Sequence, residues 1–275
     1  MTQEPAADGG SGELHAASEI PMERLAGRPL VLMLDVDGTL APIAARPSLA
    51  RVPDETRRVV AFLATRPAVK VALVSGRAAH DARRLVGVAN LWTIGNHGAE
   101  VMTPAGDVRV DPAVVAFGEP MASASRTLAA LLAPVRGAVV ENKVWTLSVH
   151  YRLVEEGLIP RLRGTVGHVA ARNGLEVSEG TKVFEVRPPV AVHKGTAIQG
   201  LARELGALDA SASLFFAGDD TTDEDAFRLL RDCCPNAVTM QVGGRSDTAA
   251  EFSRSSLDDV RVLLERIARE HTAHP

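Results

Sequence analysis

The chain has 275 residues and a formal net charge of −4, and this weakly acidic balance does not favour a nucleic-acid partner. No apolar stretch approaches the length of a membrane span. The only cysteines, the adjacent Cys233 and Cys234, form neither a disulfide framework nor a zinc pattern. The sequence therefore predicts a cytoplasmic protein that binds neither nucleic acid nor membrane. Its length suits one large α/β domain, or a core domain with a smaller insertion.

Residues 1–22 are small, polar and rich in glycine, without the basic start and apolar middle of a signal peptide. Such a composition does not bury enough apolar surface to fold. We therefore expect a disordered N-terminal tail.

The first strong signal is an apolar run over residues 30–34, which leads directly into Asp35, Asp37 and Gly38. An apolar run ended by acids and a glycine is typical of a buried parallel strand whose carboxyl end opens into a site. Residues two apart on a strand point to the same side, so Asp35 and Asp37 reach one small volume. Two carboxylates there repel unless a cation lies between them, and Mg²⁺ prefers oxygen ligands. Alone, the same residues also fit an ordinary solvated turn.

The next elements alternate between helix and strand. In order, we expect a helix over 53–66, a strand over 69–74 that ends in Ser75-Gly76-Arg77, a helix over 78–86 and a strand over 91–94. This alternation predicts a doubly wound parallel sheet of the Rossmann-like type, whose first part is residues 23–105.

The rhythm changes over residues 106–189. Here we expect helices over 111–132 and 158–173, and short strands over 138–142, 144–152, 175–178 and 182–187. The strands lack the spacing of parallel crossovers, so this segment is predicted to be an α+β cap domain inserted into the core.

The α/β rhythm returns over residues 190–275. The expected elements are a helix over 196–205, a strand over 214–217, a helix to residue 231, a strand over 237–242 and a helix over 256–270. The strand over 214–217 leads into an acidic cluster that begins at Asp219. Residues 190–275 therefore complete the core.

Four polar clusters fall at strand ends or at the helix starts beside them. They are Asp35 with Asp37 and Thr39, Ser75 with Arg77, Lys194 alone, and Asp219 with Asp220 and Asp223. Each has a purely structural interpretation, since a Ser-Gly pair is a normal helix entry and acids at a helix N-terminus meet its dipole favourably. Lysine is scarce, with four residues against 26 arginines, so Lys194 is a candidate for a task that needs a compact ammonium. In this order, the clusters predict one site at the carboxyl edge of the sheet.

The ordered set resembles the haloacid dehalogenase superfamily of aspartate-nucleophile phosphotransferases. The resemblance implies that Asp35 attacks phosphorus and Asp37 is the general acid and base. It also implies that Thr39, Ser75 and Lys194 stabilise the phosphoryl oxygens. Mg²⁺ would be held by Asp35, the Asp37 carbonyl and Asp219, with support from Asp220 and Asp223.

The insertion carries further motifs. Glu-x-Lys, His-Tyr-Arg and Glu-Val-Arg-Pro join the core motifs Asp-x-Asp-Gly-Thr-Leu, Ser-Gly-Arg, Gly-Asn-His-Gly-x-Glu, Lys-Gly and Gly-Asp-Asp-x-Thr-Asp-Glu-Asp. Over residues 30–225 this set resembles the trehalose-6-phosphate phosphatases, which implies an enzyme of trehalose biosynthesis. We expect a monomer. Substrate contacts are implied for Glu141, Lys143, Arg152 and Glu185 on the cap, and for Arg77, Asn96, His97 and Gly98 on the core.

Two positions depart from that family pattern. Val36 replaces an aromatic residue between the two aspartates, and Thr181 stands where the family often has a lysine. A contact at residue 181 is therefore lost or passes to Lys182. The charged strand faces of the insertion, such as Glu141 with Lys143 and His150 with Arg152, also fit ordinary solvated faces.

Two other functions remain open from the sequence. One is a hexose phosphomutase, because capped relatives with the same Asp-x-Asp motif catalyse isomerisation. The other is a sugar-phosphate sensor with a dormant site. Intact aspartates, lysine and acidic cluster favour the phosphatase over both.

Overall fold

A computed structural model of the protein describes residues 20–273. Residues 1–19 of the predicted tail therefore lie outside the described residues. Ile20 is buried in the core, and Met22 begins a short 3₁₀ helix (Met22–Leu25), so the folded chain begins before the predicted end of the tail at residue 22.

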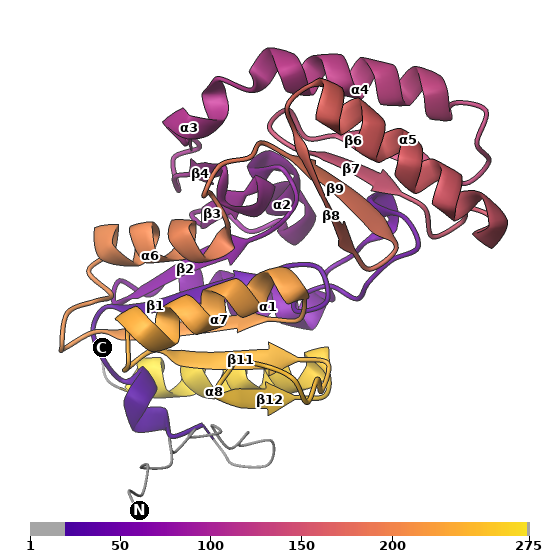
Figure 1. The fold of residues 1–275 in the computed structure, drawn as a ribbon. Coiled ribbons are helices and arrows are strands. Elements are labelled where there is room, and N and C mark those ends of the chain that lie inside the picture. Colours follow the sequence, from indigo (N-terminus) through magenta and orange to yellow (C-terminus); the bar gives the residue numbers. More distant parts are fainter. Residues whose placement is uncertain (1–19, 274–275) are drawn as a thin grey trace, which may run out of the picture.

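The core is built on a sheet of eight strands in the order β12-β11-β10-β1-β2-β3-β4-β5 (Figure 1). From β12 to β3 neighbouring strands are parallel, while β3, β4 and β5 pair antiparallel. Their bounds are β1 Leu30–Asp35, β2 Val69–Val74, β3 Trp92–Gly95, β4 Glu100–Met102, β5 Val108–Val110, β10 Ser213–Gly218, β11 Val238–Val242 and β12 Phe252–Arg254. The predicted doubly wound α/β fold is confirmed.

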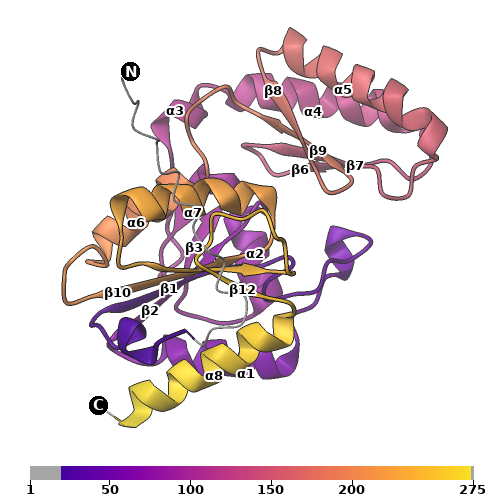
Figure 2. The same ribbon diagram turned by 60° about the horizontal axis from the view of Figure 1, so that its bottom comes forward.

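Helices cover both faces of this sheet (Figure 2). The core helices are α1 Asp54–Ala64, α2 Ala79–Val86, α6 Lys194–Glu204, α7 Thr221–Cys233 and α8 Leu257–Ala273. Along β1, Leu30, Leu32 and Leu34 pack with α1, α2 and α8, whereas Val31 and Met33 pack with α6 and α7. Because alternate residues of β1 face opposite layers and all are buried, β1 reads as a continuous apolar run.

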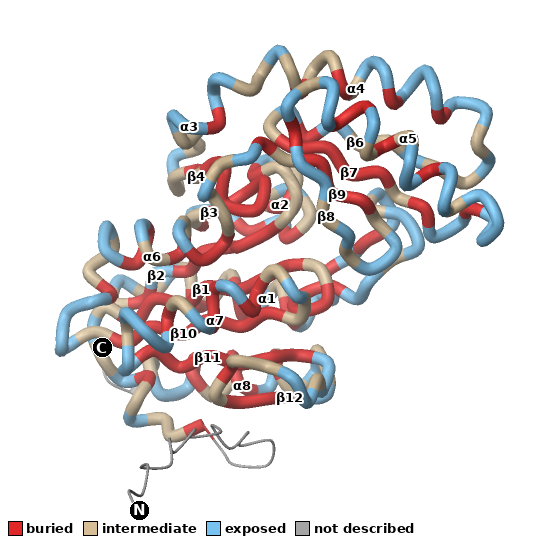
Figure 3. The backbone as a smooth tube through the Cα atoms, viewed as in Figure 1, coloured by how far each residue is buried: buried red, intermediate tan, exposed pale blue. Residues whose placement is uncertain are grey.

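The cap has its own sheet of four antiparallel strands in the order β6-β7-β9-β8. Its elements are α3 Pro112–Val115, α4 Gly118–Leu132, β6 Val139–Asn142, β7 Leu147–His150, α5 Ile159–Arg172, β8 Glu176–Gly180 and β9 Val183–Arg187. Leu147, Val149, Phe184 and Val186 pack under α4 and α5. The alternate residues of β7 and β9 lie on the opposite face of this sheet, which is turned toward the core (Figure 3).

Three details differ from the sequence prediction. The predicted helix over 111–132 is divided into α3 and α4, with Phe117 as the N-cap of α4 and Gly118 as its first residue. Strands β4, β5 and β12 have three residues each, too few for alternation to mark them. The predicted domain boundary between residues 105 and 106 falls inside the β4–β5 hairpin, which belongs to the large sheet.

Within residues 20–273, no helix combines the length and the apolarity needed to cross a membrane.

Candidate active site

A cavity of about 370 Å³ lies between the carboxyl edge of the parallel strands and the polar face of the cap sheet. Most predicted site residues line it. From the core come Asp35, Asp37, Ser75, Arg77, His97, Lys194, Asp219, Asp220 and Thr222, and from the cap Glu141, Lys143, His150, Arg152, Thr181, Lys182 and Glu185.

Lys194 is the centre of a buried charge cluster on the core side. Its ammonium, at the first position of α6, donates to Asp35 Oδ1 at 2.7 Å and to Asp223 Oδ1 at 2.8 Å. Asp223 Oδ2 accepts the backbone N–H groups of Asp219 and Asp220, each at 3.1 Å. Burial alone would lower the pKa of Lys194, but the two carboxylates raise it above the usual lysine range, so Lys194 is charged at neutral pH.

Two carboxylate oxygens in this cluster have no hydrogen-bond partner among the described residues, Asp35 Oδ2 and Asp219 Oδ1. Burial raises the pKa of Asp35 well above its usual range despite Lys194, with Asp223 and Asp219 raising it further. Burial and Asp223 raise the pKa of Asp219 to about 7. One oxygen of each of these three aspartates lies within 4.8 Å of the others. Buried, crowded oxygens of this kind fit a divalent cation of the Mg²⁺ type.

Gly38 allows this crowding. Its φ is +94°, and a Cβ atom built there would lie 1.8 Å from Asp219 Oδ2. Only glycine therefore lets the chain after β1 turn against the acidic cluster.

The side chain of Asp37 is not part of the cluster of Asp35, Asp219 and Asp223. Arg77 Nε and Nη2 donate to its two carboxylate oxygens at 2.5 and 2.6 Å, and Arg77 Nη1 donates to Pro47 O at 3.2 Å. Such a bidentate pair fixes the orientation of the carboxylate, with both of its oxygens accepting hydrogen bonds. Arg77 thus contacts Asp37 and the loop after β1, so its predicted role as a substrate ligand stays a prediction.

Three other predicted core residues occupy different environments. Ser75 lines the cavity, and its hydroxyl accepts the backbone N–H of Arg77 at 3.1 Å. Thr39 is fully buried, does not line the cavity, and its Oγ1 has no described partner. Asp220 lines the cavity but caps α7, accepting the backbone N–H of Thr221 at 2.6 Å. Asp220 is therefore committed to the helix end.

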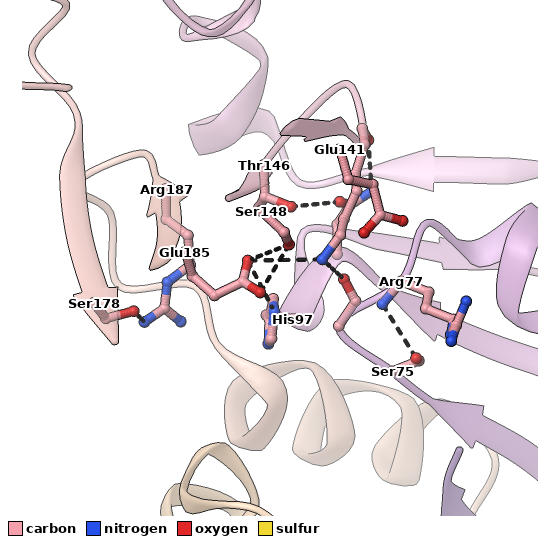
Figure 4. A network of polar contacts seen from close by, with 12 residues as sticks. Ser75, Arg77, His97, Glu141, Thr146, Ser148, Ser178, Glu185 and Arg187 are labelled. Atoms are coloured by element: carbon pink, nitrogen blue, oxygen red, sulfur yellow. Dashed lines mark hydrogen bonds and ion pairs between the residues drawn. The ribbon is translucent and has the colours of Figure 1, made fainter. Parts of the chain in front are cut away.

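Glu185 is the main carboxylate of the cap face (Figure 4). It accepts the Ser148 hydroxyl at 2.8 and 2.9 Å and lies 3.6 Å from Lys143 Nζ and 3.7 Å from His97 Nε2. Burial alone would raise the pKa of Glu185, but Lys143, His97 and Ser148 lower it to about 2. Burial lowers the pKa of His97, so the imidazole is neutral at neutral pH.

The remaining cap residues surround Glu185. Lys143 Nζ donates to Gly76 O of the core at 2.8 Å, and Glu141 lies 2.8 Å from His150 Nε2. Burial would raise the pKa of Glu141, but His150, Lys143 and Arg77 lower it. Arg152 donates to Thr181 O at 3.3 Å. The cap therefore presents ionised carboxylates beside cations, the groups that accept from and donate to sugar hydroxyls.

Comparison with known proteins agrees with this geometry. Residues 33–258 match the family model described as trehalose-phosphatase. The chain belongs to the trehalose-phosphatase family. A maize protein named trehalose 6-phosphate phosphatase is 31% identical over 261 residues, 90% of this chain and 72% of that protein.

Other relatives of this trehalose-phosphatase family member differ in length. A Mycobacterium tuberculosis protein named an uncharacterized glycosyl hydrolase is 38% identical over 210 residues, 75% of this chain, yet the match spans only 16% of that protein. Among solved structures, one titled as a trehalose-6-phosphate phosphatase related protein gives a TM-score of 0.78 at 25% identity, covering 89% of this chain and all of that one. The predicted family is thus confirmed.

Two residues predicted to line the core side lie outside the cavity. The Asn96 side chain bonds to protein groups on both domains. Gly98, with φ +109°, packs against His193, where a Cβ atom would lie 2.6 Å from the carbonyl oxygen. Neither residue lines the cavity, although Asn96 contacts the backbone carbonyl of Lys143.

The predicted site residues do not include several other residues that line the cavity. Ile43 and Pro47 come from the loop after β1, and Thr222 from the first turn of α7. The position of this loop directly after the first motif is the sequence feature that indicates it lies near the site. Thr181 and Lys182 both line the cavity, so the departure at residue 181 leaves a lysine beside the site.

Replacing Glu185 with glutamine is expected to lower the free energy of unfolding by about 3 kcal/mol at pH values above about 5. The folded-state pKa of about 2 lies below the usual value of 4.5. The contribution of ionised Glu185 to the free energy of unfolding is therefore complete above the unfolded-state pKa. It is lost as the pH falls through the folded pKa. Urea unfolding at several pH values would measure this, with Glu176→Gln, at an exposed position of β8, as the control. A gap between the wild type and Glu185→Gln that stays constant down to about pH 3 would contradict the assignment.

Proposed function

We propose that this chain is a Mg²⁺-dependent phosphatase that hydrolyses trehalose 6-phosphate to trehalose and phosphate through an aspartyl-phosphate intermediate. One observation carries the proposal. A single cavity joins the Asp35–Lys194–Asp219 cluster of the core to the Glu141, Lys143 and Glu185 face of the cap. Membership of the trehalose-phosphatase family and the name of the maize relative support the same substrate.

Asp35 Oδ2 and Asp219 Oδ1, with the Asp37 carbonyl, are the groups proposed to hold Mg²⁺. When bound, the ion supplies positive charge that offsets the carboxylates and the incoming phosphate dianion. Asp223 supports them indirectly, because its own oxygens already bind Lys194 and the backbone of Asp219 and Asp220.

The reaction proceeds in two displacements. Asp35 attacks phosphorus, the bond between phosphorus and the sugar oxygen breaks, and Asp37 gives its proton to the departing alkoxide. Asp37 then accepts a proton from water as that water attacks phosphorus. The second displacement releases phosphate and restores the Asp35 carboxylate. Arg77 donates to both oxygens of Asp37, and this arrangement suits the ionised carboxylate. One of the two bonds therefore has to open before Asp37 carries the proton that it gives to the alkoxide.

Charged and polar donors stabilise the phosphoryl oxygens during both steps. Lys194 lies 2.7 Å from Asp35, so its ammonium is next to the reacting carboxylate, and Ser75 adds a hydroxyl donor from the end of β2. Because both groups are buried before substrate arrives, they need little reorganisation in the transition state.

The cap residues determine which phosphate ester the enzyme hydrolyses. Glu141 and Glu185 would accept from sugar hydroxyls, and Lys143 and Arg152 would donate to them. A site built to pair such hydroxyls rejects phosphates that lack them, because its buried polar groups then remain unpaired.

Replacing Glu141 with alanine is expected to reduce kcat/KM for trehalose 6-phosphate about tenfold or more and to change turnover of a small aryl phosphate less than about twofold. Phosphate release would be measured over a panel of sugar phosphates with and without Mg²⁺. The control is Glu156→Ala, an exposed acid of the cap.

The same panel tests the function itself. Mg²⁺-dependent release of phosphate from the disaccharide phosphate in preference to hexose phosphates is the expected result. Equal damage to both substrates by Glu141→Ala would remove the sugar-reading role of the cap. Dependence on a bisphosphorylated sugar without phosphate release would identify a phosphomutase instead.

A further inference from the structure

The side chain of Asn96, at the junction of the two domains, makes three hydrogen bonds to protein groups. Its Nδ2 donates to Glu100 Oε1 of the core at 2.8 Å and to Lys143 O of the cap at 3.0 Å. Its Oδ1 accepts the Thr146 hydroxyl of the cap at 2.7 Å. Asn96 and Thr146 are almost fully buried, and neither lines the active-site cavity.

The cap partners of Asn96 belong to the turn between β6 and β7. That turn is closed by its own bonds, with the backbone N–H of Lys143 donating to Thr146 O and that of Trp145 to Lys143 O, each at 3.0 Å. Val144 has φ +73°, and its N–H donates to the Asn142 side chain at 2.8 Å. Asn96 therefore contacts both ends of a preformed turn, one through a carbonyl and the other through a hydroxyl.

The core side of this contact is equally fixed. Glu100 Oε1 also accepts the backbone N–H of Ala79, the first residue of α2, at 2.7 Å. A Cβ atom on Gly95 would lie 2.4 Å from that nitrogen, so glycine is required there. Asn96 itself has φ +49°, a left-handed conformation that asparagine tolerates better than most residues. The amide thus projects from a rigid support.

The turn held by Asn96 also supplies a cavity residue. Lys143, whose carbonyl accepts from Asn96, sends its ammonium to Gly76 O at 2.8 Å and lies 3.6 Å from Glu185. Holding the turn against the core therefore places Lys143 over the segment that contains Ser75 and Arg77. A displacement of about 1 Å at such a group is enough to reduce a rate about a hundredfold.

We infer that Asn96 is a latch that holds the cap closed over the cavity, and that it positions Lys143 instead of contacting the sugar. Its partners are Glu100 on the core and the turn from Lys143 to Thr146 on the cap. The kinetic consequence rests on the proposed function, whereas the structural consequence does not.

Asn96→Gly removes the side-chain amide without straining the backbone, because glycine adopts a positive φ without strain. In the full chain, amide hydrogen exchange of residues 143–147 is expected to rise about tenfold or more, because the turn separates from the core more often. The kcat/KM for trehalose 6-phosphate is expected to fall about tenfold or more. Turnover of a small aryl phosphate, which does not need the cap, should stay within about twofold of wild type.

Two further variants sharpen the test. Thr146→Val removes only the hydroxyl on the cap side and should reproduce part of the effect of Asn96→Gly, because the bond from Asn96 Nδ2 to Lys143 O remains. The double variant should add little beyond Asn96→Gly. Ser178→Ala is the matched control, since it removes a 2.6 Å bond from Arg187 that lies wholly within the cap. It should leave exchange at residues 143–147 unchanged.

The outcomes separate the latch from the proposed function. If no variant and no wild-type protein released phosphate from trehalose 6-phosphate, the proposed function would fail, and the exchange data alone would decide the latch. Unchanged exchange at residues 143–147 in Asn96→Gly would overturn the latch. In an active enzyme, equal losses for the disaccharide and aryl phosphates would overturn the positioning role.

Discussion

Asp35→Asn is expected to lower kcat at least about 10⁴-fold for every phosphate ester, including small aryl phosphates that do not need the cap. The amide keeps the shape of the carboxylate but does not form the covalent intermediate. Burial raises the pKa of Asp35, which means that its ionised form is costly in the folded state. The unfolding midpoint of the variant is therefore expected to stay level or to rise.

Single-turnover assays and thermal unfolding of the same preparation would measure both effects. Asp232→Asn, an exposed position on α7, is the control for the substitution itself. Turnover of an aryl phosphate near the wild-type rate in Asp35→Asn would place the nucleophile elsewhere and would remove the proposed mechanism.

Lys194→Met is expected to reduce both stability and turnover. It leaves Asp35 and Asp223, each previously within 2.8 Å of the ammonium, buried together without a cation. Breaking a buried ion pair in this way typically costs about 3–5 kcal/mol. Because the folded-state pKa of Lys194 is raised, its contribution is complete at neutral pH and is lost only as the pH rises through that raised value.

Urea unfolding at neutral pH in the presence of a chelator would measure the stability loss, and phosphate release would measure turnover, expected to fall at least about a thousandfold. Lys70→Met, at an exposed position of β2, is the matched control. The loss of stability should shrink in acid, where protonated carboxyls no longer need the cation. A loss below about 1 kcal/mol at neutral pH would show that the site tolerates its carboxylates without Lys194.

The central cluster was predictable because of where parallel strands end. Asp35 and Lys194 are 159 residues apart, yet the α/β pattern alone placed them, with Asp219, at one edge of a sheet. The apolar run over 30–34 and the turn at Gly38 gave the position of the first motif. What these motifs require is local, namely a polar residue at a strand end or at the helix start beside it, so a single sequence reveals it.

The partners of individual side chains were not predictable in the same way. Asn96 falls within a motif beside His97, but only the tertiary structure shows that its amide faces Glu100 and the cap turn. Arg77 likewise follows a strand end, and its pairing with Asp37 depends on the path of the loop after β1. Sequence spacing fixes the element that carries a residue, whereas long-range packing decides which group that residue contacts.

The place of β1 in the sheet also affects synthesis on the ribosome. Its neighbour β2 follows after one helix, but its other neighbour, β10, is made only after the whole cap. A nascent chain that has just completed the cap therefore exposes the apolar edge of β1. Its Asp35 is not yet paired with Lys194. Exposed strand edges promote wrong pairing, so wrong pairing of β1 is favoured during this interval of synthesis.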